Sequence, residues 1–289
     1  MTKNPLLLFY SRNNNKREIN SLRFRIHSIF FLLLIFQSSL LSQNPALRDP
    51  VRRDKYNLSQ FGDESIQFIK QPAKWESNDW LKLGLVGVGT ILIMQADQPI
   101  RDNVLRDQGY YKSFPIEAGR IWGEGYPTAI FAATFGLHGL ITNNPSTKKI
   151  GFEIVQSAIY AGAITTFLKT AIGRARPFTN KGNTSYSPFS FFNDDFNALP
   201  SGHTTLAFSL STVLSKNAES DFLKVIAYLP AVLTAISRVY QDKHWASDVF
   251  LGAAIGYFVG DWVANLHEEK ESPVQISSIY PLSIKIAIF

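Results

Sequence analysis

Apolar segments rich in Ala, Gly, Leu and Ile recur along the chain, separated by polar and charged stretches. None of these segments alternates between apolar and polar residues as a half-buried strand does, and no internal repeat is present. Their small residues allow helices to pack closely. The pattern predicts an all-α fold, a helical bundle of about six core helices. The segments are 81–94, 126–141, 150–168, 204–214, 222–239 and 249–266.

Segment length bears on whether this bundle lies in a membrane. At about 1.5 Å per residue, the segment 81–94 covers roughly 21 Å, against a hydrocarbon core of about 30 Å. The segments 150–168 and 222–239 are longer. However, Asp261 interrupts the segment 249–266, and the mean hydropathy of −0.02 is low for a polytopic protein. Two alternatives follow, a short-helix membrane bundle and a soluble envelope bundle, and we expect retention with the membrane.

The N-terminal residues have the order of a secretory signal. Basic residues 16–25 precede an apolar core, 29–36, and the small and polar residues 37–43 follow it. The apolar core is shorter than the roughly 20 residues of a membrane span. Because the site near Ser42 lacks an A-x-A sequence, an uncleaved anchor is the alternative. Both interpretations predict export, either to the inner membrane with a periplasm-facing active site or to the periplasm.

The resulting domain prediction has four parts. Residues 1–42 are a signal peptide or N-terminal anchor, and residues 43–79 are a polar lead-in. The helical domain occupies residues 80–267, and residues 268–289 form a tail. Alternation over residues 284–289 indicates one strand, which we expect to be docked or frayed because so short a tail does not make a sheet alone.

Composition excludes several classes of function. The chain has no cysteine, which rules out disulfides, thiol catalysis and Cys-based zinc sites. Its net charge of +6 does not indicate nucleic-acid binding, because residues 1–42 contain six Lys or Arg against one Glu. The remainder of the chain therefore has a net charge of about +1.

The first candidate cluster follows the segment 150–168. Lys169 and Arg176 are seven residues apart, so both side chains can point to one side of a helix. Pro177 disfavours helix at Arg176 and closes the segment. Two cations on one face suit a phosphate, while the alternative is that they complement the helix dipole or reach a membrane interface. Arg174 is an extra cation, for which we expect at most a secondary contact.

The second cluster is the sequence Pro200-Ser201-Gly202-His203, directly before an apolar segment. Helix N-termini present free amide hydrogens to anions, glycine allows close approach, and Ser201 adds a hydroxyl donor. His203 then borders the anion and is placed to protonate a leaving oxygen. The alternative is an ordinary helix cap with a surface histidine.

The third cluster contains Arg238, His244 and Asp248. The last two are four residues apart and can share a helix face. A carboxylate there can accept one ring hydrogen and leave the other nitrogen free to attack. Arg238 supplies a third cation, and the alternative is a surface His-Asp pair. The remaining histidines, His27, His138 and His267, are expected to be structural.

Together the clusters read K-x6-RP, PSGH and SR-x5-H-x3-D, in this order. On these residues the chain resembles the type 2 phosphatidic acid phosphatase superfamily, which includes bacterial acid phosphatases and vanadium haloperoxidases. The resemblance is loose over residues 80–267 and closest over residues 150–262. It implies a phosphohistidine on His244, orientation of that ring by Asp248, and general acid catalysis by His203. The implied phosphate ligands are Lys169, Arg176, Ser201, Gly202 and Arg238.

The function expected from these residues is hydrolysis of a lipid phosphate or diphosphate without a metal or other cofactor, since a cationic cradle stabilises the transferring group. The alternatives are a non-specific periplasmic acid phosphatase acting on small phosphoesters, a vanadium-dependent haloperoxidase, and a non-catalytic phosphate-binding membrane protein. Vanadate is an expected inhibitor. Residues 44–149 and 178–199 carry no motif, so the lipid headgroup is left open.

Overall fold

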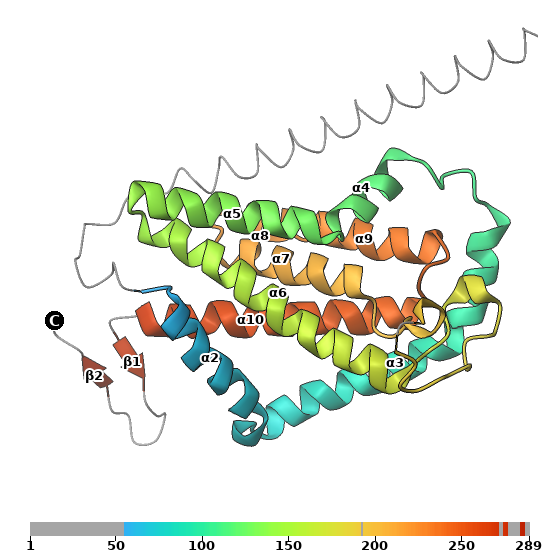
Figure 1. The fold of residues 1–289 in the computed structure, drawn as a ribbon, viewed down its shortest axis with the longest axis horizontal. Coiled ribbons are helices and arrows are strands. Elements are labelled where there is room, and N and C mark those ends of the chain that lie inside the picture. Colours follow the sequence, from blue (N-terminus) through green and yellow to red (C-terminus); the bar gives the residue numbers. More distant parts are fainter. Residues whose placement is uncertain (1–54, 192, 272–273, 277–283, 287–289) are drawn as a thin grey trace, which may run out of the picture. The chain divides into compact units, whose positions relative to one another are not determined.

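A computed structural model describes residues 55–191, 193–271, 274–276 and 284–286, with side chains up to residue 268. The predicted signal peptide or anchor, 1–42, lies outside the described residues. The described residues are mainly helical, which confirms the all-α class. The α-helices, labelled in Figure 1, are α2 Leu58–Lys70, α3 Ser77–Arg106, α4 Phe114–Trp122, α5 Gly125–Thr142, α6 Pro145–Ile172, α7 Gly202–Lys216, α8 Asp221–Ile226, α9 Leu229–Tyr240 and α10 Ala246–Glu271. Short 3-10 helices are Gln71–Lys74, Pro177–Thr179 and Asp194–Phe196.

Helix α7 lies inside the bundle, packed against α6, α9 and α10 (Figure 1). A stripe of glycines on α10, Gly252, Gly256 and Gly260, explains how closely α10 approaches it. Residues four apart share a helix face, and a Cβ at Gly256 would lie 2.3 Å from the Thr205 carbonyl oxygen. Since backbone occupies this space, the stripe sets the distance between α10 and the first turn of α7.

Helix α3 differs from its predicted length. Its 30 residues extend beyond the apolar segment 81–94 through Pro99 to Arg106. A helix of this length covers about 45 Å, more than a hydrocarbon core of about 30 Å, so the roughly 21 Å expected from the apolar segment alone understated its length. Among the described residues, four helical stretches are long and apolar enough to cross a membrane: Ser77–Arg106, Pro145–Ile172, Asp221–Tyr240 and Ala246–Glu268.

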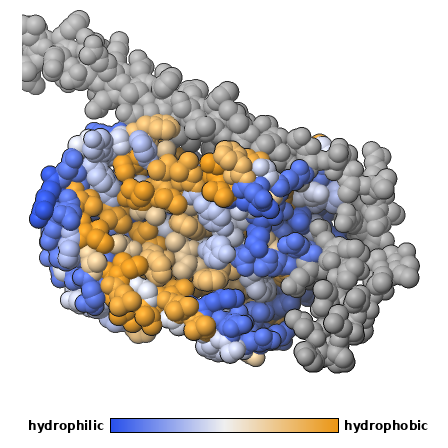
Figure 2. All heavy atoms as spheres, turned by 180° about the vertical axis from the view of Figure 1, so that it is seen from behind, coloured by the Kyte–Doolittle hydropathy of each residue, from blue (hydrophilic) through white to orange (hydrophobic). Residues whose placement is uncertain are grey.

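The surface of the described bundle is also apolar. Figure 2 shows hydrophobic residues gathered in a broad band across the middle of one face, with hydrophilic residues on either side of it. On α3, Leu81, Leu85, Val88 and Leu92 each expose more than half of their surface. Apolar residues exposed over successive turns of a long helix are typical of a lipid-facing surface, and they support association with a membrane.

Three other predictions of local structure need correction. The segment 222–239 forms two helices, α8 and α9, with Pro230 in the first turn of α9. The lead-in contains α2, which packs on the bundle: the ring of Phe68 stacks on Tyr160, with centroids 4.4 Å apart. The tail has two strands where one was expected, since β1 Val274–Ile276 pairs antiparallel with β2 Ile284–Ile286.

Candidate active site

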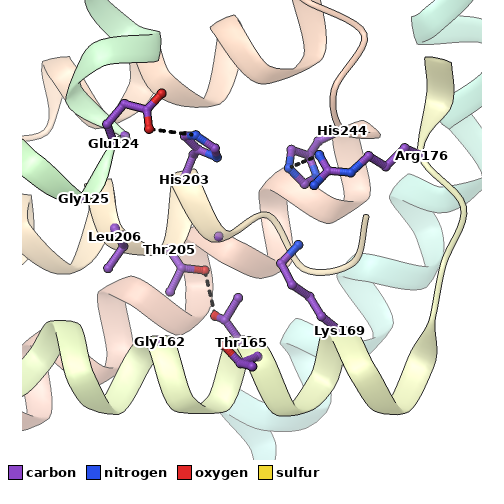
Figure 3. A pocket seen from close by; sticks show the side chains of 13 residues that line it. Glu124, Gly125, Gly162, Thr165, Lys169, Arg176, His203, Thr205, Leu206 and His244 are labelled. Atoms are coloured by element: carbon purple, nitrogen blue, oxygen red, sulfur yellow. Dashed lines mark hydrogen bonds and ion pairs between the residues drawn. The ribbon is translucent and has the colours of Figure 1, made fainter. Parts of the chain in front are cut away.

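A cavity of about 350 Å³ lies where α6 ends and where α7 and α10 begin. Lys169, Arg176, Gly202, His203 and His244 all line it. Figure 3 shows the side chains of these cations and histidines converging from different elements. The structure thus brings members of all three sequence clusters into one cavity.

The loop that follows α6 places Arg176 in this cavity. Gly173 closes α6 with a φ of 60°, a conformation that favours glycine, and an added Cβ would lie 1.9 Å from the Ser187 carbonyl oxygen. The loop is then tied down at its first residues, because the indole Nε1 of Trp245 donates to the Ala175 carbonyl at 2.9 Å. Arg176 follows directly and therefore lies beside the residues that begin α10.

His244 is 2% exposed, and its two ring nitrogens have different surroundings. Nδ1 lies 2.8 Å from the carbonyl oxygen of Ala198, which can only accept, so Nδ1 carries the hydrogen. Nε2 then holds a lone pair, and Nη1 of Arg176 lies 3.4 Å from it. Burial and the surrounding cations lower the pKa of His244 well below its ordinary value. The ring is therefore neutral, and its unprotonated Nε2 points toward the cavity, where it accepts a long hydrogen bond from Arg176.

The sequence predicted that Asp248 accepts the ring hydrogen of His244, but in the structure it does not. Its Oδ2 lies 3.7 Å from Nδ1, beyond hydrogen-bond distance, and accepts from the Trp245 amide at 2.8 Å. The carbonyl of Ala198 takes the ring hydrogen in its place, an acceptor that no sequence motif marks. Asp248 thus faces the ring as a nearby buried charge.

Arg174 has a larger role than the secondary contact expected for it. Its side chain is fully buried and donates from Nη1 to Asp248 at 2.8 Å and from Nη2 to Asp97 at 2.7 Å. It does not line the cavity among the described residues. Asp97 was missed entirely, because it lies just beyond the apolar segment 81–94, in a polar and charged stretch that carries no motif.

His203 lies beside Glu124, a cavity residue that the sequence analysis also missed. The two side chains form an ion-pair contact of 3.6 Å between Nε2 and Oε2 (Figure 3). Burial and the charge of Arg238 lower the pKa of His203 to about 4, and Glu124 partly opposes this shift. A carboxylate set between Gly123 and Gly125 at a helix junction is the only sequence feature that could have pointed to Glu124.

The predicted phosphate ligands differ in their access to the cavity. Lys169 donates to the Asn197 carbonyl, and Arg176 donates from Nη2 to Asp194 at 2.6 Å. Arg238 does not line the cavity; its Nη2 donates to Gln241, while its buried Nε has no partner among the described residues.

Ser201 is fully buried and also lies outside the cavity lining. Its Oγ accepts from the Thr204 hydroxyl at 3.0 Å, and its amide donates to the Asp248 carbonyl at 2.9 Å. Gly202, the next residue, begins α7 and borders the cavity, where a first-turn amide has no acceptor in its own helix. Among the described residues, no group of three or more His, Asp or Glu side chains could hold a metal ion.

Comparisons with known proteins agree with the sequence resemblance. Residues 151–272 match the family model of the PAP2 superfamily. A stretch of 92 residues is 38% identical to a lipid A 1-phosphatase of Porphyromonas gingivalis, covering 30% of this chain and 21% of that protein. Another, of 137 residues, is 30% identical to an undecaprenyl-diphosphatase of Sulfolobus acidocaldarius, covering 46% and 61%. The chain thus spans less than two thirds of the length of either relative.

A solved structure is also similar, the crystal structure of a transmembrane PAP2 type phosphatidylglycerolphosphate phosphatase from Bacillus subtilis. The TM-score is 0.48 at 17% sequence identity, and the match covers 64% of this chain and 94% of that chain.

Proposed function

The chain carries a PAP2 superfamily domain over residues 151–272, and from this premise we propose that it hydrolyses a lipid phosphate or diphosphate through a phosphohistidine on His244. The observation that carries the proposal is the state of the His244 ring. Its Nδ1–H is bound to the Ala198 carbonyl, so the lone pair of Nε2 faces a cavity that Lys169 and Arg176 also line. A neutral nucleophile beside cations suits attack on a phosphoryl group.

In the first step, the lone pair of Nε2 attacks phosphorus in line with the leaving oxygen. The P–N bond forms as the P–O bond breaks, and His203 gives its proton to the departing oxygen. Lys169, Arg176 and the Gly202 amide bind the equatorial oxygens, and Arg238 adds a positive field from behind the cavity wall. The imidazole becomes a cation, which the buried charge of Asp248 stabilises.

In the second step, water attacks the phosphohistidine. His203, now neutral, takes a proton from the water as the new P–O bond forms, and the P–N electrons return to Nε2. This restores the acid form of His203 and the neutral form of His244. Each turnover therefore releases one alcohol or phosphorylated alcohol and one inorganic phosphate.

Bound substrate is expected to raise the pKa of His203 and so to favour the protonated form that the reaction needs. Burial and Arg238 lower this pKa to about 4, which leaves the ring neutral near pH 7. A bound phosphate brings negative charge next to the ring and raises the pKa toward the range where the ring holds a proton. The acid form of His203 is thus favoured when substrate is present.

The uncharged part of the cavity supports a lipid substrate. Gly125, Gly162 and Leu206 line it, and an added Cβ at either glycine would have no atom within 4 Å. Figure 3 shows Gly162 and Leu206 on the side of the cavity away from Arg176. The charged end of the cavity therefore continues into open space beside Gly162, a residue of α6, and this helix is long and apolar enough to cross a membrane.

The test compares wild-type protein with Gly162→Leu on a panel of lipid phosphates in mixed micelles and on water-soluble p-nitrophenyl phosphate. We expect kcat/KM to fall by about tenfold more for the lipids than for the soluble ester, because leucine fills the uncharged space. Gly87→Leu is the matched control, since it also lies on a long apolar helix with no atom within 4 Å. Equal losses on both substrates, or a wild-type preference for the soluble ester, would favour the non-specific acid phosphatase.

The same preparation tests the mode of catalysis. We expect EDTA to leave the rate unchanged and vanadate to inhibit at concentrations well below those of phosphate, because a trigonal-bipyramidal oxyanion resembles the transition state. Activity that is lost on chelation and returns with a divalent ion would contradict the phosphohistidine mechanism.

We also propose that the cavity faces the periplasm. The absence of native cysteine allows a direct test by single-cysteine labelling. Lys181→Cys probes the loop beside the cavity, and Ile141→Cys probes the opposite end of α5. A membrane-impermeant maleimide added to intact spheroplasts should label the first and spare the second; the reverse pattern would place the cavity in the cytoplasm.

A further inference from the structure

Helix α3 exposes most of its apolar residues, yet one of its carboxylates is buried. Asp97 is 1% exposed, and Thr90 is the other buried residue of this helix. A buried carboxylate costs several kcal/mol unless it is paired and hydrogen-bonded. Asp97 also lies upstream of residues 151–272, the part of the chain that matches the family model.

Asp97 belongs to a buried network that ends at the nucleophile. Its Oδ2 accepts from Nη2 of Arg174 at 2.7 Å and from the Ser247 hydroxyl at 2.5 Å, and its Oδ1 accepts from the Ser247 amide at 2.9 Å. Nη1 of Arg174 donates to Oδ1 of Asp248 at 2.8 Å, and Oδ2 of Asp248 faces Nδ1 of His244. Every residue in this chain of contacts is less than 3% exposed.

We propose that Asp97 is a positioning residue for the phosphoryl-transfer reaction, acting on His244 through Arg174 and Asp248. The inference rests on the proposed function. It adds a residue from α3, outside the matched domain, to the groups on which turnover depends. Asp97 does not touch the cavity among the described residues, so its action is indirect.

The charges explain how Asp97 acts. The guanidinium of Arg174 lies between two carboxylates, so the set of three has a net charge of −1 when all are ionised. Without Asp97, Arg174 neutralises Asp248 alone and the set is neutral. The imidazolium that forms during attack then loses the favourable field at its Nδ1 side, where buried charges act strongly.

Geometry adds a second contribution. Asp97 accepts from both the amide and the hydroxyl of Ser247, the residue directly before Asp248 in the first turn of α10. It therefore fixes the start of this helix against α3, and with it the carboxylate that faces His244. The other charged or titratable groups that act on His244 are Lys169, Arg176, His203 and Arg238.

The experiment uses full-length Asp97→Asn, which keeps the size of the side chain and removes its charge. We expect kcat to fall by about tenfold with KM changed less than about twofold, since substrate binding is untouched. The acidic limb of the kcat/KM profile should move to lower pH, because loss of a negative charge near His244 lowers its pKa. Thr90→Val, a buried change on the same helix, and Asp102→Asn, an exposed charge loss there, should leave all three quantities unchanged.

A double-mutant cycle separates action through Asp248 from a general structural effect. In the Asp248→Asn background, Asp97→Asn should lower kcat by less than about twofold, because the path to His244 is already interrupted. Additive losses, or an unchanged pH limb in Asp97→Asn, would overturn the inference. If that variant does not fold, Ser247→Ala serves in its place: a several-fold drop in kcat with KM unchanged is expected, and wild-type kcat would overturn the inference. Wild-type protein without phosphatase activity would refute the proposed function itself.

Discussion

Two buried histidines, His244 and His267, differ in what their ring nitrogens contact, and the difference bears on the roles proposed for them. Both are at most 2% exposed, and both lie near buried carboxylates. In His267 each ring nitrogen faces a carboxylate, with Nδ1 3.0 Å from Glu153 and Nε2 3.1 Å from Glu64. In His244 the nearby carboxylate of Asp248 lies 3.7 Å from Nδ1, beyond hydrogen-bond distance, and Nε2 faces the cavity.

The two histidines differ in the surroundings of Nε2. His267 joins three helices, since Glu64 is on α2, Glu153 on α6 and His267 on α10, and neither of its nitrogens remains for chemistry. In His244, Nδ1 donates to a backbone carbonyl, whereas Nε2 points into the cavity and has only the long contact of 3.4 Å with Arg176 among the described residues. Burial and a neighbouring carboxylate therefore do not identify a nucleophile; the proposal for His244 rests on an unprotonated ring nitrogen directed into a cationic cavity.

The largest expected effect is that of His244→Ala on turnover. We predict a loss of at least about 10⁴-fold, because the group that bonds to phosphorus is gone. The cations remain, so the folded variant should bind phosphate with an affinity close to that of wild type. His138→Ala, another partly buried histidine with a single hydrogen bond to Thr147, is the control and should retain activity. A His244→Ala rate near wild type would end the contrast between the two histidines.

Asp248→Asn should have the next largest effect. We predict a fall in kcat of about 10² to 10³, the loss typical of removing one group that stabilises the transition state electrostatically. The ring hydrogen of His244 stays bound to Ala198, so the tautomer is kept and only the field is lost. Steady-state kinetics of the folded variant measures this. A loss greater than that of His244→Ala would mean that the two roles are misassigned.

Glu124→Gln should have a smaller effect, on the acid histidine. Removing this carboxylate lowers the pKa of His203 further, since Glu124 opposes the shift caused by burial and by Arg238 and Arg176. We predict about a tenfold loss near pH 7 and a basic limb of the kcat profile displaced to lower pH, where the acid form survives. Exposed Glu219→Gln is the control. A basic limb that stays in place would show that Glu124 does not act on His203.

The smallest effect on turnover is expected for His267→Ala. The folded fraction should keep its specific activity, while the free energy of unfolding falls by about 3 kcal/mol because two buried carboxylates lose their contacts with the imidazole ring. Thermal unfolding in detergent micelles measures the second quantity. Normal stability together with lost activity would reverse the roles assigned to the two histidines.

The sequence predicted the parts of this structure that depend on local pattern. Apolar runs identified the main helices, and the three motifs identified five residues that line the cavity, because each motif is short and adjacent to a helix end. The length of α3 was missed since its second half, which includes Pro99, is polar and charged. The break between α8 and α9 was missed because the run 222–239 is apolar throughout most of its length.

Contacts between distant segments were the part that sequence reasoning could not supply. Asp97 meets Arg174 only because α3 crosses the start of α10, and Glu124 meets His203 only because the junction of α4 and α5 lies against α7. The acceptor for the His244 ring, the carbonyl of Ala198, is a backbone atom that any residue would provide. Motifs indicate which side chains form a site, whereas tertiary packing determines which atoms become their hydrogen-bond and ion-pair partners.

The most direct test of the central claim is to trap the covalent intermediate. Full-length protein is mixed with a phosphate-labelled lipid, quenched within milliseconds in alkaline detergent, where phosphohistidine survives, and digested for peptide mapping. We predict up to one labelled phosphoryl group per chain, on the peptide that contains His244, and none in His244→Ala. Rapid turnover by wild-type protein with no label, or label that persists in His244→Ala, would contradict the phosphohistidine mechanism.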